Sequence, residues 1–246
     1  MLQYTSPHST HRVPEGVAPP RARRKIARVT TIAEAPPVYP SRAAAGAVLG
    51  RLLCQRCEPP LLLLGVTPTG VEIAASAAKG TSSAFDVIVG AHVRVEGHGI
   101  VGAIAEDTDA VIDRLFNPSF DMLDALHEAI DRARRAVKSE RLLFRGQRQL
   151  RALSGYNVAV IDGHAVTPWK LLAAAHGARV LGADRVFVAA AVTTQEVKEK
   201  VFAYKYDFIC PTVVFDPAGH PRPFGDDQDA GAERLRSIVV ARQAAA

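Results

Sequence analysis

Four short, mostly apolar runs alternate along the chain with longer segments whose apolar residues recur every three or four positions. The runs occupy residues 61–66, 86–90, 157–161 and 185–192. Each has the length of a strand, and none alternates as a half-exposed strand does, so we predict buried parallel strands. The segments between them have the period of helices. This alternation predicts an α/β protein, a parallel sheet with helices on both faces.

The expected helices follow from apolar stripes and terminal residues, such as Ser41 as the N-cap of the first helix. They occupy residues 41–56, 71–79, 169–181, 193–204 and 230–242, and a last strand pair is expected at 207–214. The longest helix is expected to begin at Asn117-Pro118, because proline suits a first helical turn. Residues 97–102 satisfy G-x-G-x-x-G. A dinucleotide fingerprint needs a strand before it and a long helix after it, so we expect no such site here.

One strand–helix junction has the features of a phosphate site. Asp162 follows a buried strand and is therefore expected at its carboxyl end. Gly163 permits a tight turn, Thr167 is expected to cap the next helix, and Pro168 suits its first position. Ligands of open parallel sheets bind at the carboxyl ends of strands, and free N–H groups at a helix N-terminus favour phosphate.

We expect a phosphate or a nucleotide phosphate to bind at residues 164–170 with modest affinity. The expected contacts are backbone amides of the loop, the hydroxyl group of Thr167 and the side chain of Lys170 in the first helical turn. The residues concerned are Gly163, His164, Ala165, Val166, Thr167 and Lys170.

These residues resemble the signature of the type I phosphoribosyltransferases, in particular a bacterial branch of uncharacterised members. The resemblance extends over residues 39–238. S-R-A-A-A-G at 41–46 resembles the opening helix of the family, and G-A-I-A at 102–105 resembles a turn. F-R-G at 144–146 is the third matching motif. It implies the α/β fold predicted above. In that family the strand ends in two acids that hold ribose hydroxyls, and the loop after them cradles the 5′-phosphate.

Matched by position, Asp162 stands at the first acid and becomes the catalytic candidate, whereas Gly163 replaces the second acid. Family members grip a Mg²⁺-bound sugar pyrophosphate, so Mg²⁺ is expected only with such a ligand, and no metal site of the protein's own is expected. Losing a carboxylate removes hydrogen bonds worth about 1.5–3 kcal/mol. If the ribose pocket is otherwise intact, restoring it in Gly163→Asp is expected to improve Mg²⁺-dependent binding of the sugar pyrophosphate.

Two further family positions lose positive charge. The pyrophosphate loop P-R-G-G is replaced by T-P-T-G at 67–70, and an Arg-Lys pair is replaced by Ala91-His92. The candidate ligand contacts in these places are Thr67, Thr69, Gly70 and His92. Little except His92, Lys170 and backbone amides is then expected to neutralise pyrophosphate.

The leading interpretation is a phosphoribosyltransferase-like domain that binds a phosphorylated nucleotide or phosphoribosyl-type ligand with weakened or absent catalysis. Its role would be regulatory or partner-binding. One alternative is an active phosphoribosyltransferase, a pentosyl transferase, with a divergent phosphate loop. A second alternative is a polyanion- or protein-interaction module, in which the sheet is only a scaffold.

The second alternative depends on where the net charge of +5 lies. Residues 1–40 hold six basic residues, two acids and seven of the sixteen prolines. We predict a disordered basic arm over 1–38, with polyanion binding as one role, and a domain over 39–246. Residues 132–151 hold eight basic residues and one acid, after an acidic block at 106–131. Arg134, Lys138, Arg141 and Arg145 share a helical stripe there, which suits a polyanion or an acidic block in a homo-oligomer.

The remaining composition points to a cytoplasmic protein. Three cysteines, Cys54, Cys57 and Cys210, are too few for a disulfide scaffold. No apolar run approaches the roughly 18 residues of a membrane span, so no membrane partner is expected. The first residues lack the apolar core of a signal peptide.

Overall fold

The computed structural model describes residues 38–215, 222–226 and 231–243. The predicted basic arm over 1–38 lies outside these residues except for Val38, and so do Asp227 and Asp229 before the last helix. No helix among the described residues is long and apolar enough to cross a membrane.

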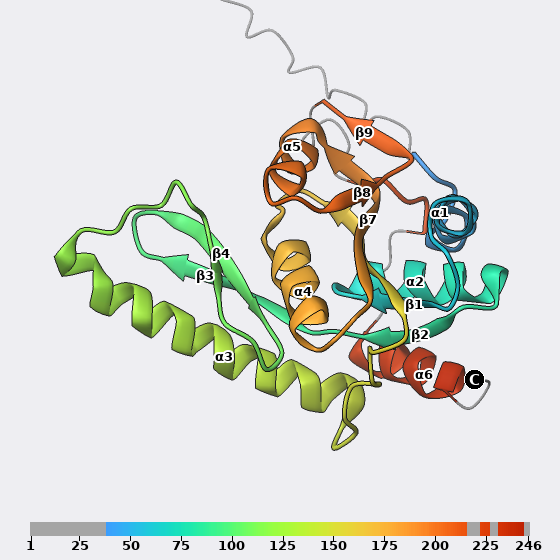
Figure 1. Ribbon diagram of the computed structural model, residues 1–246, viewed down its shortest axis with the longest axis horizontal. Coiled ribbons are helices and arrows are strands. Elements are labelled where there is room, and N and C mark those ends of the chain that lie inside the picture. The colour runs from blue at the N-terminus through green and yellow to red at the C-terminus, as the bar shows by residue number, and fades with distance from the viewer. Residues whose placement is uncertain (1–37, 216–221, 227–230, 244–246) are drawn as a thin grey trace, which may run out of the picture. The chain divides into compact units, whose positions relative to one another are not determined.

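A six-stranded sheet forms the centre of the fold (Figure 1). Its strands are β1 (Leu61–Gly65), β2 (Ala84–Val87), β6 (Asn157–Ala165), β7 (Arg185–Thr194), β8 (Asp207–Ile209) and β9 (Thr212–Val214). The order is β2-β1-β6-β7-β8, with β9 also paired to β7, and every pair is parallel. The predicted neighbours are therefore confirmed, because the four apolar runs lie side by side with the 157–161 run in the interior.

Helices cover both faces of this sheet, as the alternation predicts. They are α1 (Arg42–Arg56), α2 (Pro68–Thr81), α4 (Trp169–Val180), α5 (Gln195–Ala203) and α6 (Ala232–Gln243). Side chains of α1, α2 and α6 share one apolar cluster with Leu61 and Ile161, and those of α4 and α5 share another with Leu62 and Val160. Alternate residues of each strand thus pack into opposite clusters, because successive side chains point to opposite faces.

A second, antiparallel sheet follows β2, and the sequence did not predict it. It consists of β3 (Gly90–Val95), β4 (Gly99–Ala105) and β5 (Val111–Ile112), in the order β3-β4-β5. The expected strand at 86–90 therefore ends in the main sheet at Val87, and Gly90 begins the hairpin. Gly97 and Gly99 have φ values of 74° and 72°, which form the tight turn between β3 and β4.

This hairpin explains two motifs. The G-x-G-x-x-G stretch is a hairpin turn and the start of β4, and no helix opens at it. The motif therefore lacks the helix that a dinucleotide fingerprint needs. The G-A-I-A turn expected at 102–105 is wrong, because these residues are the end of strand β4 and pair with β3 and β5.

The longest helix, α3 (Leu123–Arg145), lies along the hairpin (Figure 1). It begins later than expected, because a 3₁₀ turn, Phe120–Met122, precedes it and Pro118 lies outside the helix. Two ion pairs with buried carboxylates hold the C-terminal end of α3 and the segment after it. Arg145 pairs with Glu106, and Arg148 pairs with Asp86 in β2.

The C-terminal segment returns to the start of the domain. Tyr39 bridges to Phe224, and the carboxylate of Asp226 accepts a hydrogen bond from the amide of Arg42. Ser41 caps α1 as predicted, since its hydroxyl group accepts from the amide of Ala44. Asp226 therefore stabilises the start of α1.

Candidate functional site

The carboxyl ends of β1 and β6 meet at one edge of the sheet, and the predicted site lies there. Gly65 at the end of β1 is in register with Ile161, the residue before Asp162. Helix α2 begins within three residues of β1, and α4 begins soon after β6. The edge is the position at which open parallel sheets bind ligands.

Asp162 is buried at this edge and its carboxyl group is held by the chain itself. Its Oδ1 accepts a hydrogen bond of 2.5 Å from the hydroxyl group of Thr67, and only 7% of the residue is exposed. Burial raises the pKa of Asp162, while the hydrogen bonds from Thr67 and from the amides of Gly163 and His164 oppose this rise. A ligand hydroxyl that approaches Oδ1 of Asp162 would compete with Thr67.

The sequence analysis expected residues 67–70 to form a loop. They instead form the start of helix α2. Thr67 is the N-cap, its hydroxyl group accepts from the amide of Gly70, and Pro68 occupies the first turn. Threonine followed by proline is a strong helix start, because the side chain caps and proline has no N–H to satisfy. Thr69 and Gly70 are therefore fixed in a helical turn that packs on β6.

This packing leaves no room for a side chain at Gly163. A β-carbon there would lie 2.6 Å from Cβ of Thr69 and 2.7 Å from its hydroxyl oxygen. A β-carbon at Gly70 would in turn collide with the carbonyl group of Ile161. The first turn of α2 thus occupies the space that a side chain at Gly163 would need. On these steric grounds we no longer expect Gly163→Asp to improve ligand binding.

The segment between β6 and α4 is shorter than predicted. The strand continues through Ala165, because His164 and Ala165 pair with Val192 and Thr193 of β7. Helix α4 has Pro168 as its N-cap residue and no side-chain cap, so the predicted capping by Thr167 is wrong. The loop consists of Val166, Thr167 and Pro168, and His164 and Ala165 belong to the strand.

Thr167 instead contacts the hairpin sheet. Its hydroxyl oxygen lies 3.2 Å from Nε2 of His92 in β3. Burial, followed by the charges of Lys170 and Arg94, lowers the pKa of His92 to about 4. His92 is therefore neutral at pH 7, and Lys170 is the cation that acts on both His92 and Asp162.

The residues at this edge do not fit a carboxylate-held Mg²⁺. Asp162 is bonded to Thr67, and Gly163 has no room for a second carboxylate. Over the described ranges, no group of three or more His, Cys, Asp or Glu residues is placed to hold a metal. The cysteines in these ranges, Cys54, Cys57 and Cys210, are all free.

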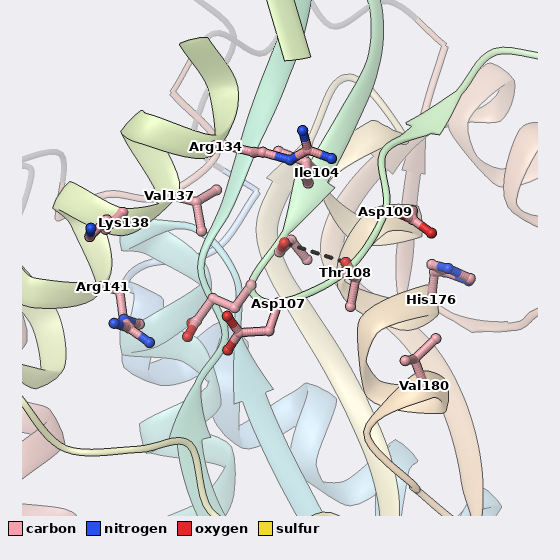
Figure 2. A pocket seen from close by; sticks show the side chains of 12 residues that line it. Ile104, Asp107, Thr108, Asp109, Arg134, Val137, Lys138, Arg141, His176 and Val180 are labelled. Atoms are coloured by element: carbon pink, nitrogen blue, oxygen red, sulfur yellow. Dashed lines mark hydrogen bonds between the residues drawn. The ribbon is translucent and has the colours of Figure 1, made fainter. Parts of the chain in front are cut away.

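A cavity of about 580 Å³ lies in a second place, between α3, α4 and the loop after β4 (Figure 2). Its lining includes Arg134, Lys138 and Arg141, the basic stripe that the sequence singled out. Asp107, Asp109 and His176 line it too, and the sequence analysis did not place them at a site. The signal for them was the acidic block that precedes the basic one, but only the fold brings the two blocks together.

Comparison with known proteins supports the fold. No protein-family model matches the chain. The chain is similar to the crystal structure of TT1426 from Thermus thermophilus, with a TM-score of 0.71 and 22% identity, over 82% of this chain and 98% of that one. This likeness confirms the predicted α/β fold class, with a mostly parallel sheet.

Phosphoribosyltransferases are among the other similar structures. Adenine phosphoribosyltransferase from Thermoanaerobacter pseudethanolicus has a TM-score of 0.43 and 12% identity, over 70% of this chain and 80% of that one. A hypoxanthine phosphoribosyltransferase from Staphylococcus aureus has a TM-score of 0.42 and 9% identity, over 71% of this chain and 73% of that one.

Proposed function

We propose that this phosphoribosyltransferase-like domain binds a phosphorylated nucleotide or phosphoribosyl-type ligand at the carboxyl edge of β1 and β6, with little or no transferase activity. The observation that supports this proposal is the contact between Gly163 and Thr69. Because α2 occupies the place of the second acid, the ribose hydroxyls lose one carboxylate, and the other is bonded to Thr67. The protein therefore binds the ribose of such a ligand only weakly.

The start of α4 supplies the anion-binding groups in this proposal. The amides of Trp169, Lys170 and Leu171 have no hydrogen-bond acceptor within the described residues, since α4 has no side-chain cap. Such amides and the helix dipole favour a phosphate group. Lys170 adds a positive charge in the same turn, and Thr167 adds a hydroxyl group.

Departure of pyrophosphate needs more positive charge than this edge supplies. The leaving group carries several negative charges, and its stabilisation is usually the largest part of catalysis. His92, which the sequence analysis counted among the neutralising groups, is uncharged at pH 7 because burial lowers its pKa to about 4. We expect 5-phosphoribosyl transfer to common bases to be very slow or undetectable, consistent with a regulatory or partner-binding role.

The geometry favours this function over polyanion binding by the 132–151 block. Arg145 and Arg148 of that block are committed to the buried carboxylates of Glu106 and Asp86. A continuous basic stripe from Arg134 to Arg145 is therefore not presented to a partner.

Calorimetric titration with phosphoribosyl pyrophosphate and with inorganic phosphate, each with and without Mg²⁺, tests the proposal. The double variant Thr167→Ala/Lys170→Ala should weaken phosphate binding by about 1–3 kcal/mol, which is about 5- to 150-fold. Lys79→Ala, which removes an exposed lysine from the last turn of α2, is the matched control. Unchanged phosphate affinity in the double variant, or rapid transferase turnover by the natural chain, contradicts the proposal.

A further inference from the structure

The cavity between α3 and α4 has two walls of opposite charge (Figure 2). Arg134, Lys138 and Arg141 project from α3 on one side, and Asp109 and His176 lie on the other. The volume, about 580 Å³, falls within the range of about 300–1,000 Å³ that is usual for small-molecule sites.

The basic wall is a single row of side chains. Arg134, Lys138 and Arg141 follow one another at helical spacings of four and three residues, so they share one face of α3. Lys138 and Arg141 form no ion pair within the described part of the chain, and Arg134 has only an exposed pair with Asp131. An exposed pair of this kind is weak, so all three cations are free to meet an anionic ligand.

The acidic wall is the turn after β4. Asp107 has a left-handed backbone conformation, with φ of 52°, and Asp107, Thr108 and Asp109 all line the cavity. Glu106 also lines it, but its carboxylate is bonded to Arg145 and to the amide of Val89. Glu106 is thus neutralised, and the free charges of the lining are three cations and two carboxylates.

Apolar side chains lie between the two walls. They come from three elements and consist of Ile104 on β4, Val137 on α3 and Val180 on α4. A flat, weakly polar group fits such a surface, because its burial is favourable and requires no further hydrogen bonds.

We propose that this cavity binds a nucleoside 5′-monophosphate. Its phosphate group meets the row of cations on α3, its base lies on the apolar surface, and its ribose hydroxyls and base N–H groups donate to Asp107 and Asp109. The cavity is distinct from the proposed phosphate site at the sheet edge. Lys170 lies in the first turn of α4, whereas His176 and Val180 lie in its last turns.

Calorimetric titration of the full chain with AMP, adenosine and inorganic phosphate tests this site. AMP should bind at least about tenfold more tightly than adenosine, because a charge-assisted contact to phosphate has that strength. Lys138→Gln/Arg141→Gln should weaken AMP binding at least about tenfold and leave adenosine binding nearly unchanged. The control is Arg135→Gln, an exposed arginine of α3 outside the cavity lining, which should leave AMP binding unchanged.

Two further variants distinguish the contribution of the acidic wall from that of the basic wall, and the cavity from the sheet edge. Asp109→Asn should weaken AMP and adenosine but not inorganic phosphate, because only the nucleosides have donors for this carboxylate. Thr167→Ala/Lys170→Ala should leave AMP binding at the cavity unchanged, which distinguishes this site from the sheet edge. Thermal unfolding verifies that each variant folds, since surface substitutions have small effects on stability.

Two results would overturn the proposal. They are an AMP affinity weaker than about 1 mM and an equal loss in the Lys138→Gln/Arg141→Gln and Arg135→Gln variants. Loss of AMP binding only in Thr167→Ala/Lys170→Ala would place the nucleotide at the sheet edge, and would also reject the cavity as its site.

Discussion

Thr69 in the first turn of α2 lies so close to Gly163 in β6 that a β-carbon at Gly163 would be 2.6 Å from Cβ of Thr69. The atom that would clash is Cβ, the first atom of the threonine side chain, and rotation of the side chain does not move it. The contact therefore fixes glycine at this position and keeps the helix against the strand end.

Gly163→Ala should destabilise the domain by about 1–3 kcal/mol, because an added methyl group forces α2 away from β6. Gly163→Asp should cost at least as much and should not improve Mg²⁺-dependent binding of phosphoribosyl pyrophosphate. Urea denaturation measures the first effect and calorimetry the second. Gly80→Ala, in helix α2, is the control, because a β-carbon at Gly80 meets nothing within 4 Å. It should be neutral or stabilising by about 1 kcal/mol.

Thr67→Val should cost about 1–3 kcal/mol, because it removes the cap of α2 and the donor to the buried Asp162 carboxyl group. Thr81→Val removes a hydroxyl group near the other end of the same helix, where it bonds only to Ala77 and Ser83. This control should cost less. Equal losses in urea denaturation would mean that the contact to Asp162 adds nothing.

Asp162→Asn should change the pH dependence of stability in a defined direction. Burial raises the pKa of Asp162 in the folded state, so the folded protein binds this proton more tightly than the unfolded chain. The resulting stabilisation is complete below the ordinary aspartate pKa and is lost as pH rises through the raised value. The stability of Asp162→Asn relative to the natural chain should therefore increase from about pH 4 toward pH 7 in denaturation measurements. A constant difference would contradict the raised pKa.

His92 should remain neutral through most of the acidic range. Its folded-state pKa of about 4 lies below the ordinary histidine value, so it contributes stability above about pH 6.5 that is lost as pH falls toward 4. NMR titration should show no ionisation of His92 above about pH 5. Lys170→Ala should raise its pKa only partly, because burial is the larger cause. Titration of His92 near pH 6.5 in the natural chain would show that its imidazole group is exposed to solvent.

Glu106→Gln should destabilise the domain by about 3–5 kcal/mol, because it leaves the guanidinium group of Arg145 buried without its counter-ion. The double change Glu106→Leu/Arg145→Met should recover much of this loss, since neither charge is then buried. Asp131→Asn, which breaks the exposed pair with Arg134, is the control and should cost less than about 1 kcal/mol. Thermal unfolding of the three variants makes the comparison, and equal losses would contradict the buried character of the Glu106 pair.

Much of the central sheet could be predicted from the chain alone. Runs such as 61–66 and 157–161 are apolar at every position but one or two, and only a strand buried on both faces accommodates that pattern. The Ser41 cap was equally local, because a helix N-terminus needs an acceptor within three residues. The hairpin from Gly90 to Ala105 was missed, since its two glycines matched a different motif and its strands cover a helix rather than join the main sheet.

The sequence by itself determined which residues gather at the sheet edge, because parallel strands bring Asp162 and Thr67 to the same end. It did not determine what those residues are free to do. The extension of β6 to Ala165 and the neutral state of His92 depend on contacts between distant segments. Bonding of a carboxyl group, space for a β-carbon and desolvation of an imidazole are set by neighbours in space, and so only the tertiary structure decided them.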